Sequence, residues 1–163
     1  MANIITNKLI INGEKKEVNK VLDFIKVGKE DNSEVYGIGT IDFNKITPMT
    51  KWICGAGPNF SGISNKDEEK YEKENTYLEW AKRNWGTKVN AYNLPNESNY
   101  ENIIYFETKW TGVPNLIQKI SIIFPNVVID YSFYDVEDNI STFIFKNTEV
   151  LYQFDNFNSE YEN

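Results

Sequence analysis

The sequence predicts an α+β fold, with helices packed on one face of a mainly antiparallel sheet. Apolar residues recur at helical spacing in some segments and alternate with polar residues in others. Strand–helix–strand order is followed by closely spaced strands that are typical of hairpins. The length of 163 residues fits one domain. We expect that domain to span 1–154, with a loop and helix insert at about 50–86 and an acidic, frayed tail at 155–163.

The chain begins with a predicted strand at 4–12 and a predicted helix at 14–26. Leu9 and Ile11 share one face of the strand. The helix carries apolar residues at i, i+3, i+4 and i+7, namely Val18, Val21, Leu22 and Ile25. Residues 39–48 then predict a short extended piece, and Pro48 disfavours helix at Thr47.

The middle of the chain predicts an irregular loop and the longest helix. Residues 52–66 are rich in glycine, which favours a loop. The pattern Ser64-x-x-Asp67 is typical of a helix start. We expect this helix to continue to Trp85 and Gly86 to end it in the left-handed conformation.

The last part of the chain predicts strands around one more helix. We expect a short strand at 87–93 and a clear one at 102–110. Pro114 suits the first turn of a helix, and Pro125 stops it. Successive strands, joined by tight turns, are then predicted at 126–135, 140–146 and 149–154.

Composition excludes several chemistries. The chain has no histidine, which removes the commonest general base and transition-metal ligand, and its one cysteine cannot form an internal disulfide. The net charge of −7 and the single arginine, Arg83, argue against direct nucleic-acid binding. No apolar run is long enough for a membrane helix, and the first residues do not resemble a signal peptide. We expect a protein of the bacterial cytoplasm.

Several local patterns suggest chemistry, and each has a simpler structural interpretation. Cys54 has no histidine to activate it, so an inert, partly buried thiol is favoured. Residues 55–62 lack the Lys-Ser/Thr pair of a phosphate-binding loop and favour a flexible loop. Residues 135–139 are too few for a calcium loop and favour a solvated hairpin turn. The acidic face at 67–80 resembles a row of phosphates, but a plain solvated helix face is favoured.

The strand at 102–110 presents different side chains on its two faces. The solvent-facing set is Tyr105, Glu107 and Lys109, and the opposite set is Ile104, Phe106, Thr108 and Trp110. Glu107 could pair with Glu101 or Asp130 as catalytic carboxylates. Cross-strand ion pairs are the simpler interpretation. The mixed polar and aromatic face suits the docking of a protein.

The corner RNWGTKVNAYNL is the densest unusual stretch. A helix end explains much of it, because Arg83 suits the helix dipole, Trp85 closes the apolar stripe and Gly86 turns the chain. Thr87 then begins extended structure. Lys88 has no structural role that the sequence reveals, and it is the first place where we expect function.

Two motifs, NWGTKVNAY and YFETKWTGVP, with IDFNKITPM upstream and FPNVVIDYSFYD downstream, resemble the YubB ferredoxin-like family of proteins encoded by phages, plasmids and genomic islands. The resemblance covers about residues 3–146. The matching positions are Pro48, Met49, Trp85, Gly86, Thr87, Lys88, Phe106, Glu107, Thr108 and Trp110, and the departures are Thr50, Val89 and Lys109. The resemblance implies a ferredoxin-like α+β architecture and a mobile-element setting. It implies no catalytic residue, because none is established in the family.

We therefore expect a non-enzymatic phage or mobile-element protein that binds and inhibits a host protein. A CRISPR effector, or another defence complex with a basic surface, is the kind of partner that the setting and the acidic charge suggest. No catalytic residue, metal or cofactor is expected, nor any contact with a membrane. The candidate contact residues are Arg83, Trp85, Thr87, Lys88, Tyr105, Glu107, Lys109 and Trp110.

Two other functions stay open. The chain could bind a small, nucleotide-like ligand, or act on one as an enzyme, in a pocket between the 52–66 loop and the 83–94 corner. The polar contacts would come from Arg83, Lys88 and Glu107. The chain could also self-associate through exposed aromatic residues such as Trp52 and Phe60. The sequence leaves its oligomeric state open.

Overall fold

The computed structural model describes residues 4–26, 41–49, 76–88, 90–93, 102–137 and 139–155. The expectations for the 52–66 loop, for the cap at Ser64–Asp67 and for the acidic residues 67–75 lie outside these ranges. So do the expectations for Cys54, Trp52, Phe60 and the tail beyond Asp155.

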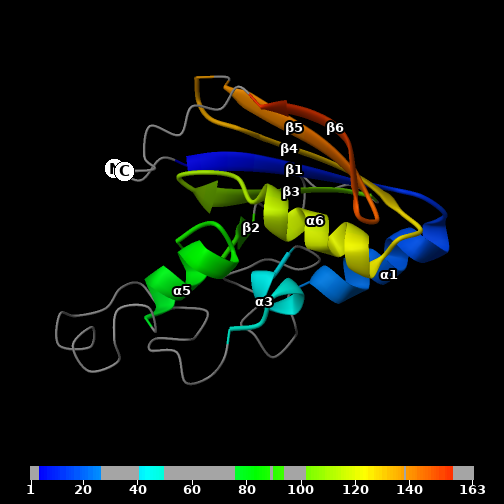
Figure 1. The fold of residues 1–163 in the computed structure, drawn as a ribbon, viewed down its shortest axis with the longest axis horizontal. Coiled ribbons are helices and arrows are strands. Elements are labelled where there is room, and N and C mark those ends of the chain that lie inside the picture. Colours follow the sequence, from blue (N-terminus) through cyan, green and yellow to red (C-terminus); the bar gives the residue numbers. More distant parts are fainter. Residues whose placement is uncertain are drawn as a thin grey trace.

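A single antiparallel sheet contains the described strands, in the order β2-β3-β1-β4-β5-β6 (Figure 1). They are β1 (Ile4–Asn12), β2 (Tyr92–Asn93), β3 (Ile103–Lys109), β4 (Val128–Tyr134), β5 (Ile140–Lys146) and β6 (Glu149–Asp155). β1 pairs in the antiparallel sense with both β3 and β4. β3 and β4 therefore run in the same direction on either side of β1.

The described helices lie on one side of this sheet (Figure 1). They are α1 (Lys15–Ile25), α3 (Phe43–Ile46), α5 (Tyr77–Asn84) and α6 (Pro114–Ile123). α6 connects β3 to β4, and its first turn holds Pro114, as predicted. None of the described helices is long and apolar enough to cross a membrane. The arrangement confirms the predicted α+β class.

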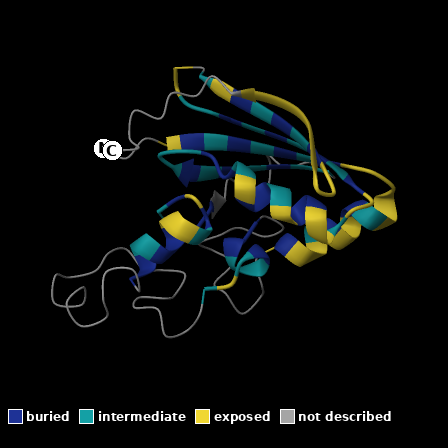
Figure 2. Ribbon diagram, viewed as in Figure 1, coloured by how far each residue is buried: buried dark blue, intermediate teal, exposed yellow. Residues whose placement is uncertain are grey.

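Alternate residues of the strands point toward the helices and form the core, which gives the banded pattern of burial in Figure 2. Leu9, Phe106 and Ile129 are among those fully or almost fully buried. From the other side, α1 buries Val18, Val21 and Ile25, which are three of the four residues of its predicted stripe. Burial of each large aliphatic side chain contributes about 1.5 to 3 kcal/mol relative to exposure.

A short extended piece was predicted within 39–48, but the helical turn α3 at the centre of this range was missed. The Asp42 carboxylate starts this turn, because its Oδ1 accepts a hydrogen bond of 2.9 Å from the backbone N–H of Asn44. Asp42 itself is extended, and so is Thr47, as expected before Pro48. Asp42, as a residue that caps helix starts, is the sequence signal for this turn that the prediction overlooked.

The predicted helix from Asp67 to Trp85 is not continuous, because it is interrupted at Thr76. Thr76 has φ −84° and ψ 157°, which is extended backbone, so α5 begins at Tyr77. Its end is as predicted, because Gly86 takes the left-handed conformation with φ +83°.

Of the short strand predicted at 87–93, only two of the described residues, Tyr92 and Asn93, form strand structure, and they pair with β3. The strand predicted at 102–110 ends at Lys109. Trp110 is partly buried and has a left-handed φ of 79°, so it does not continue the buried face of Ile104 and Phe106. The local cause is a turn that leads from β3 into α6.

Candidate functional site

The corner after α5 packs against the end of β3. The hydroxyl of Thr87 donates a hydrogen bond of 2.8 Å to the carbonyl oxygen of Lys109. The Nζ atom of Lys88 lies 4.2 Å from the centroid of the Trp110 ring. Two motifs that are separate in the sequence therefore meet in space, and four of the eight candidate residues make these contacts, namely Thr87, Lys88, Lys109 and Trp110.

Trp85 is the anchor of the corner rather than an exposed contact. Its side chain is 1% exposed, and its indole N–H donates to the carbonyl oxygen of Thr47 over 2.9 Å. The ring makes edge-to-face contacts with Phe43, Tyr77 and Trp80 at centroid distances of 5.8, 6.0 and 5.3 Å. Such burial leaves Trp85 no surface for a partner, and its role is to fix α5 against α3.

Lys88 has a structural role that spacing along the chain does not reveal. Its ammonium group lies over the face of Trp110, an arrangement in which the ring quadrupole attracts the cation. Thr87 is 3% exposed, so it too holds the corner from inside. Arg83 lies on the exposed side of α5. Of the candidate residues at this corner, Arg83, Lys88 and Trp110 retain surface that a ligand or partner can reach.

Tyr105, Glu107 and Lys109 lie on the face of the sheet that is opposite to the helices, as predicted. All three are partly buried. The Nζ atom of Lys8, on the neighbouring strand, lies 5.8 Å from the centroid of the Tyr105 ring. These residues form part of a wider surface, the outer sheet face, which also includes Thr6, Ile10, Asp130, Ser132, Tyr134, Thr142, Ile144, Tyr152 and Phe154.

A carboxylate pair between Glu107 and Asp130 does not form. Glu107 is opposite Thr6 on β1, whereas Asp130 is opposite Ile10. These two positions are separated by about 13 Å along the strand. Glu107 also makes no ion pair with a residue in the described ranges, so the simpler prediction of a cross-strand ion pair fails for it as well. Glu101 lies outside those ranges.

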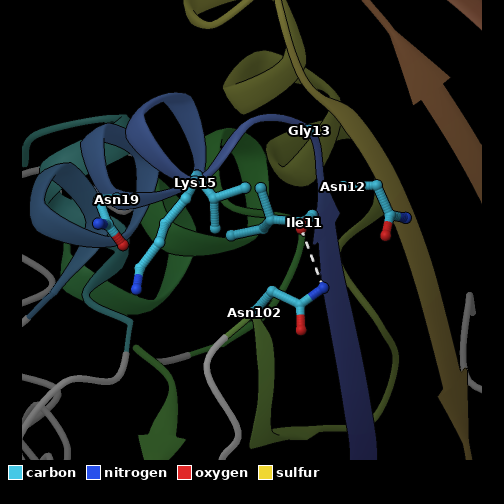
Figure 3. Close-up of a pocket in the computed structure, with 7 residues that line it drawn as sticks. Ile11, Asn12, Gly13, Lys15, Asn19 and Asn102 are labelled. Carbon is cyan, nitrogen blue, oxygen red and sulfur yellow. Dashed lines mark hydrogen bonds between the residues drawn. The ribbon is translucent and has the colours of Figure 1, made fainter.

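A cavity of about 460 Å³ lies where β1 turns into α1 (Figure 3). Figure 3 shows Lys15 and Asn19 on one side of it and Asn102 on the other, where the Asn102 amide donates to the carbonyl oxygen of Ile11 over 3.3 Å. Its volume suits a small ligand. The lining contains no residue of the 83–94 corner, where sequence reasoning placed a pocket.

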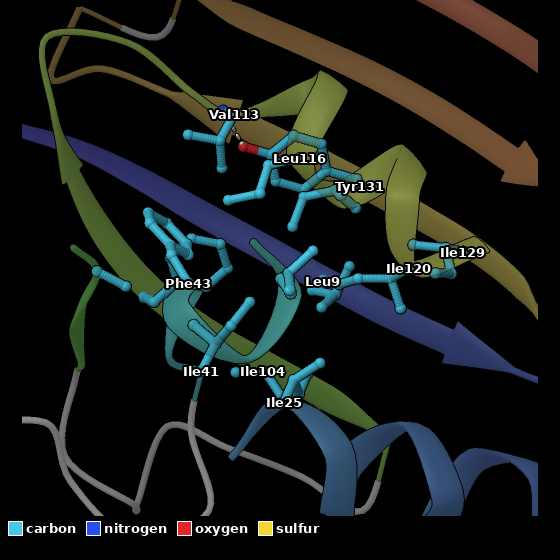
Figure 4. Packing of buried hydrophobic residues seen from close by; sticks show 14 of the residues in the cluster. Leu9, Ile25, Ile41, Phe43, Ile104, Val113, Leu116, Ile120, Ile129 and Tyr131 are labelled. Carbon is cyan, nitrogen blue, oxygen red and sulfur yellow. Dashed lines mark hydrogen bonds between the residues drawn. The ribbon is translucent and has the colours of Figure 1, made fainter. Parts of the chain in front are cut away.

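A buried network of hydrogen bonds crosses the centre of the sheet. The Val113 N–H donates to the Tyr131 hydroxyl over 2.8 Å, as Figure 4 shows, and that hydroxyl donates to Oδ1 of Asn7. The Asn7 amide donates to Oγ1 of Thr108, which donates to the carbonyl oxygen of Thr111. Burial raises the pKa of Tyr131 well above its usual range. The network fixes the turn from β3 into α6, and the inward-facing Asn7 was the one sequence signal for it.

A second buried network joins the start of α3 to residue 90. The Asn90 amide group donates to Oδ1 of Asp42 over 2.7 Å, and its oxygen accepts from the backbone N–H groups of Phe43 and Ala91. Asp42 and Asn90 are each 5% exposed. Because every one of these contacts serves a backbone or side-chain group of the fold, the network is structural, and sequence reasoning missed it.

The acidic turn at 135–139 is a polar hairpin turn between β4 and β5, as predicted. Oδ1 of Asp135 accepts from the backbone N–H groups of Glu137 and Asn139, and Oδ2 accepts from the Asn139 amide. The side-chain hydrogen bond from Asn139 is the largest influence that lowers the pKa of Asp135. Within the described ranges, no group of three or more His, Cys, Asp or Glu residues is placed to hold a metal ion.

Comparison with known proteins finds no family model that matches the chain, and no curated protein or solved structure that is significantly similar to it.

Proposed function

We propose that this chain is a non-enzymatic binding protein that inhibits a host protein by occupying one of its surfaces. The observation that carries the proposal is the outer sheet face, on the opposite side from the described helices. It combines aromatic, aliphatic and charged side chains in cross-strand rows, such as Tyr105, Lys8, Ser132 and Thr142. Mixed surfaces of this kind supply aromatic anchors and a polar surround for a protein partner.

The charge of the chain supports a basic partner. A net charge of −7 accelerates encounter with a positively charged surface and disfavours contact with nucleic-acid phosphate. A defence complex that binds nucleic acid has such a surface. A CRISPR effector in the bacterial cytoplasm is therefore the partner class that we propose.

The order of elements supports a ferredoxin-like fold, which we propose as the finer description of the α+β class. In that fold, two strand–helix–strand units interlock so that each pair of parallel strands flanks a strand of the other unit. Here α6 joins β3 to β4 across β1, and the order β2-β3-β1-β4 agrees with this scheme. The hairpin of β5 and β6 then extends the sheet. Membership of the YubB family is the corresponding proposal for origin, and it rests on the quoted motifs.

Affinity capture from host lysate tests the proposed function. The wild-type chain should recover a defence protein and should protect a phage or plasmid from immunity. The variant Tyr105→Ala/Glu107→Lys should lose both properties, because it removes an aromatic anchor and reverses a charge on the outer sheet face. Lys16→Ala, on the exposed side of α1, is the matched control and should retain both. Recovery of no host protein together with no protection would contradict the proposal.

A small-ligand function has one observation in its favour, the cavity beside α1. Lys15 and the side-chain amides of Asn19 and Asn102 offer it one positive charge and several hydrogen-bonding groups (Figure 3). A thermal-shift screen with nucleotides and cyclic nucleotides tests this alternative, because a ligand that binds the folded state raises the melting temperature. A large shift that Lys15→Ala abolishes would favour ligand binding over protein binding.

A further inference from the structure

β6 is an edge strand of the sheet. Among the strands in the described ranges, β5 alone pairs with it. In an antiparallel sheet, alternate residues of an edge strand direct their N–H and C=O groups away from the neighbouring strand. The seven residues Glu149–Asp155 therefore present a row of backbone donors and acceptors to whatever lies beside the sheet.

The side chains of β6 are unusually apolar for an exposed edge. Val150, Leu151, Tyr152 and Phe154 are 44%, 52%, 50% and 47% exposed. Proteins protect edges of this kind with lysine, proline or a bulge. Within the part of the chain that the structure describes, the protection is limited to a shift of register at Leu151, and the stretch from Tyr152 onward pairs regularly with β5. Tyr152 and Phe154 also extend the outer sheet face, opposite Ile144 and Thr142.

We propose that β6 binds an extended segment of a partner protein by adding it to the sheet as a further strand. The segment has alternating apolar residues in its centre and Lys or Arg at its ends. This inference rests on the proposed function in taking the partner to be a protein, and it specifies how that partner is bound.

Charge favours a partner segment that ends in Lys or Arg over a second copy of this chain. Glu149 and Asp155 stand at the two ends of β6. Antiparallel pairing of two copies about Tyr152 would place Glu149 of one opposite Asp155 of the other, at both ends, and like charges directly opposite are destabilising. The net charge of −7 on each copy adds to this repulsion. Lysines of a partner segment would instead be attracted to the exposed Glu149 and to the net negative charge of the chain.

The test uses a fluorescent peptide, Lys-Lys-Val-Thr-Val-Thr-Val-Lys-Lys, titrated into the full chain. It should bind, and amide hydrogen exchange of β6 should slow when it does, because outward N–H groups gain partners. The same peptide with glutamates in place of lysines should bind at least about tenfold more weakly. N-methylation of alternate peptide residues should abolish binding in one of the two possible patterns and preserve it in the other, because a strand has one edge in contact with β6.

Protein variants locate the site. Phe154→Lys should weaken peptide binding at least about tenfold, since it removes apolar contact and repels the peptide. Ile122→Lys on α6 is the matched control, because Ile122 is 48% exposed and Phe154 is 47% exposed. It should bind the peptide as the wild type does, and both variants should retain the wild-type circular dichroism spectrum.

Several results would overturn the inference. These are absence of peptide binding, equal binding of the glutamate-flanked peptide, equal effects of the two N-methylation patterns, or loss of binding in Ile122→Lys as well. A dimer in sedimentation that Phe154→Lys dissociates would show that a second copy occupies the edge. If host capture succeeds but Phe154→Lys captures the host protein as well as the wild type does, the proposed function is retained and the role of β6 is contradicted.

Discussion

The ammonium group of Lys88 lies over the ring of Trp110, 4.2 Å from its centroid. Trp110 has a left-handed φ of 79°, a backbone conformation that costs a non-glycine residue about 1 to 2 kcal/mol. Two hydrogen bonds hold the residues next to Trp110: Thr87 donates to the carbonyl oxygen of Lys109, and Thr108 donates to the carbonyl oxygen of Thr111. The corner after α5 thus holds the turn after β3 in place.

Lys88→Ala should lower the free energy of unfolding by about 0.5 to 1 kcal/mol, which is the range for a cation–π contact at a partly exposed site. Lys88→Arg should retain most of this stability, because a guanidinium also stacks on an indole ring. Urea unfolding followed by tryptophan fluorescence measures both. Lys16→Ala is the control on an exposed helix face and should change stability by less than about 0.5 kcal/mol. Equal effects of the two alanine variants would remove the role assigned to Lys88.

Gly112→Ala should destabilise the fold by about 1 to 3 kcal/mol, because overpacking a buried site forces its neighbours to move. A Cβ atom at residue 112 would lie 2.2 Å from Cδ1 of the Phe133 ring. Gly86→Ala is the informative comparison. That site has open space for a Cβ, but its φ of +83° costs alanine about 1 to 2 kcal/mol. Adding Phe133→Leu should recover stability in the Gly112 variant and not in the Gly86 variant, and thermal unfolding distinguishes the two. A Gly112→Ala protein as stable as the wild type would contradict the close packing.

Tyr131→Phe should cost about 2 to 4 kcal/mol, because the Val113 N–H and Oδ1 of Asn7 both lose a buried partner. Tyr134→Phe, one residue beyond Phe133 on the outer sheet face, is the matched control and should be nearly neutral. Chemical unfolding at pH 7 gives both values. The network would lose its assigned importance if the two variants behaved alike.

The stability that Tyr131 confers should fall at high pH. Its pKa is raised in the folded state from an ordinary value of 10.0, chiefly by burial, so the unfolded chain releases the phenolic proton first. The contribution is complete below pH 10 and is lost progressively as pH rises above that value. Urea unfolding at pH 8 and pH 11 should therefore show a smaller difference between wild type and Tyr131→Phe at the higher pH. A difference that is constant across this window would exclude the linkage.

Asn139→Ala should raise the pKa of Asp135 toward its ordinary value of 3.8, because the Asn139 side chain is the largest influence that lowers it. A lowered pKa contributes stability above the ordinary value, and this contribution is lost as pH falls through the folded-state pKa. Asp135 is close to solvent, so the effect on unfolding is small, and NMR titration of its carboxyl carbon is the sensitive measurement. An unchanged midpoint for Asp135 would show that the Asn139 bond is not responsible.

Local patterns were sufficient for most elements of the fold. Alternation predicted β1, β3 and β4, helical spacing predicted α1 and α6, and turn residues between short strand-like runs predicted β5 and β6. The end of α5 was also predictable, since Gly86 satisfies the left-handed position that ends a helix. The errors arose at two helix starts that the local pattern placed wrongly. Asp42 caps a helical turn in a segment expected to be extended, and Thr76 is extended in a segment expected to be helical.

The sequence by itself determined the α+β class, the alternating faces of the strands and the acidic charge of the chain. The tertiary structure decided what its most unusual residues do. Lys88 contacts Trp110, Asn7 bonds to Thr108, and Asn90 bonds to Asp42, and each pair is far apart along the chain. Such contacts depend on strand order and register, which no local spacing encodes. The exposed edge at β6 is likewise a property of strand order, because an edge strand can be recognised only once the order of the strands is known.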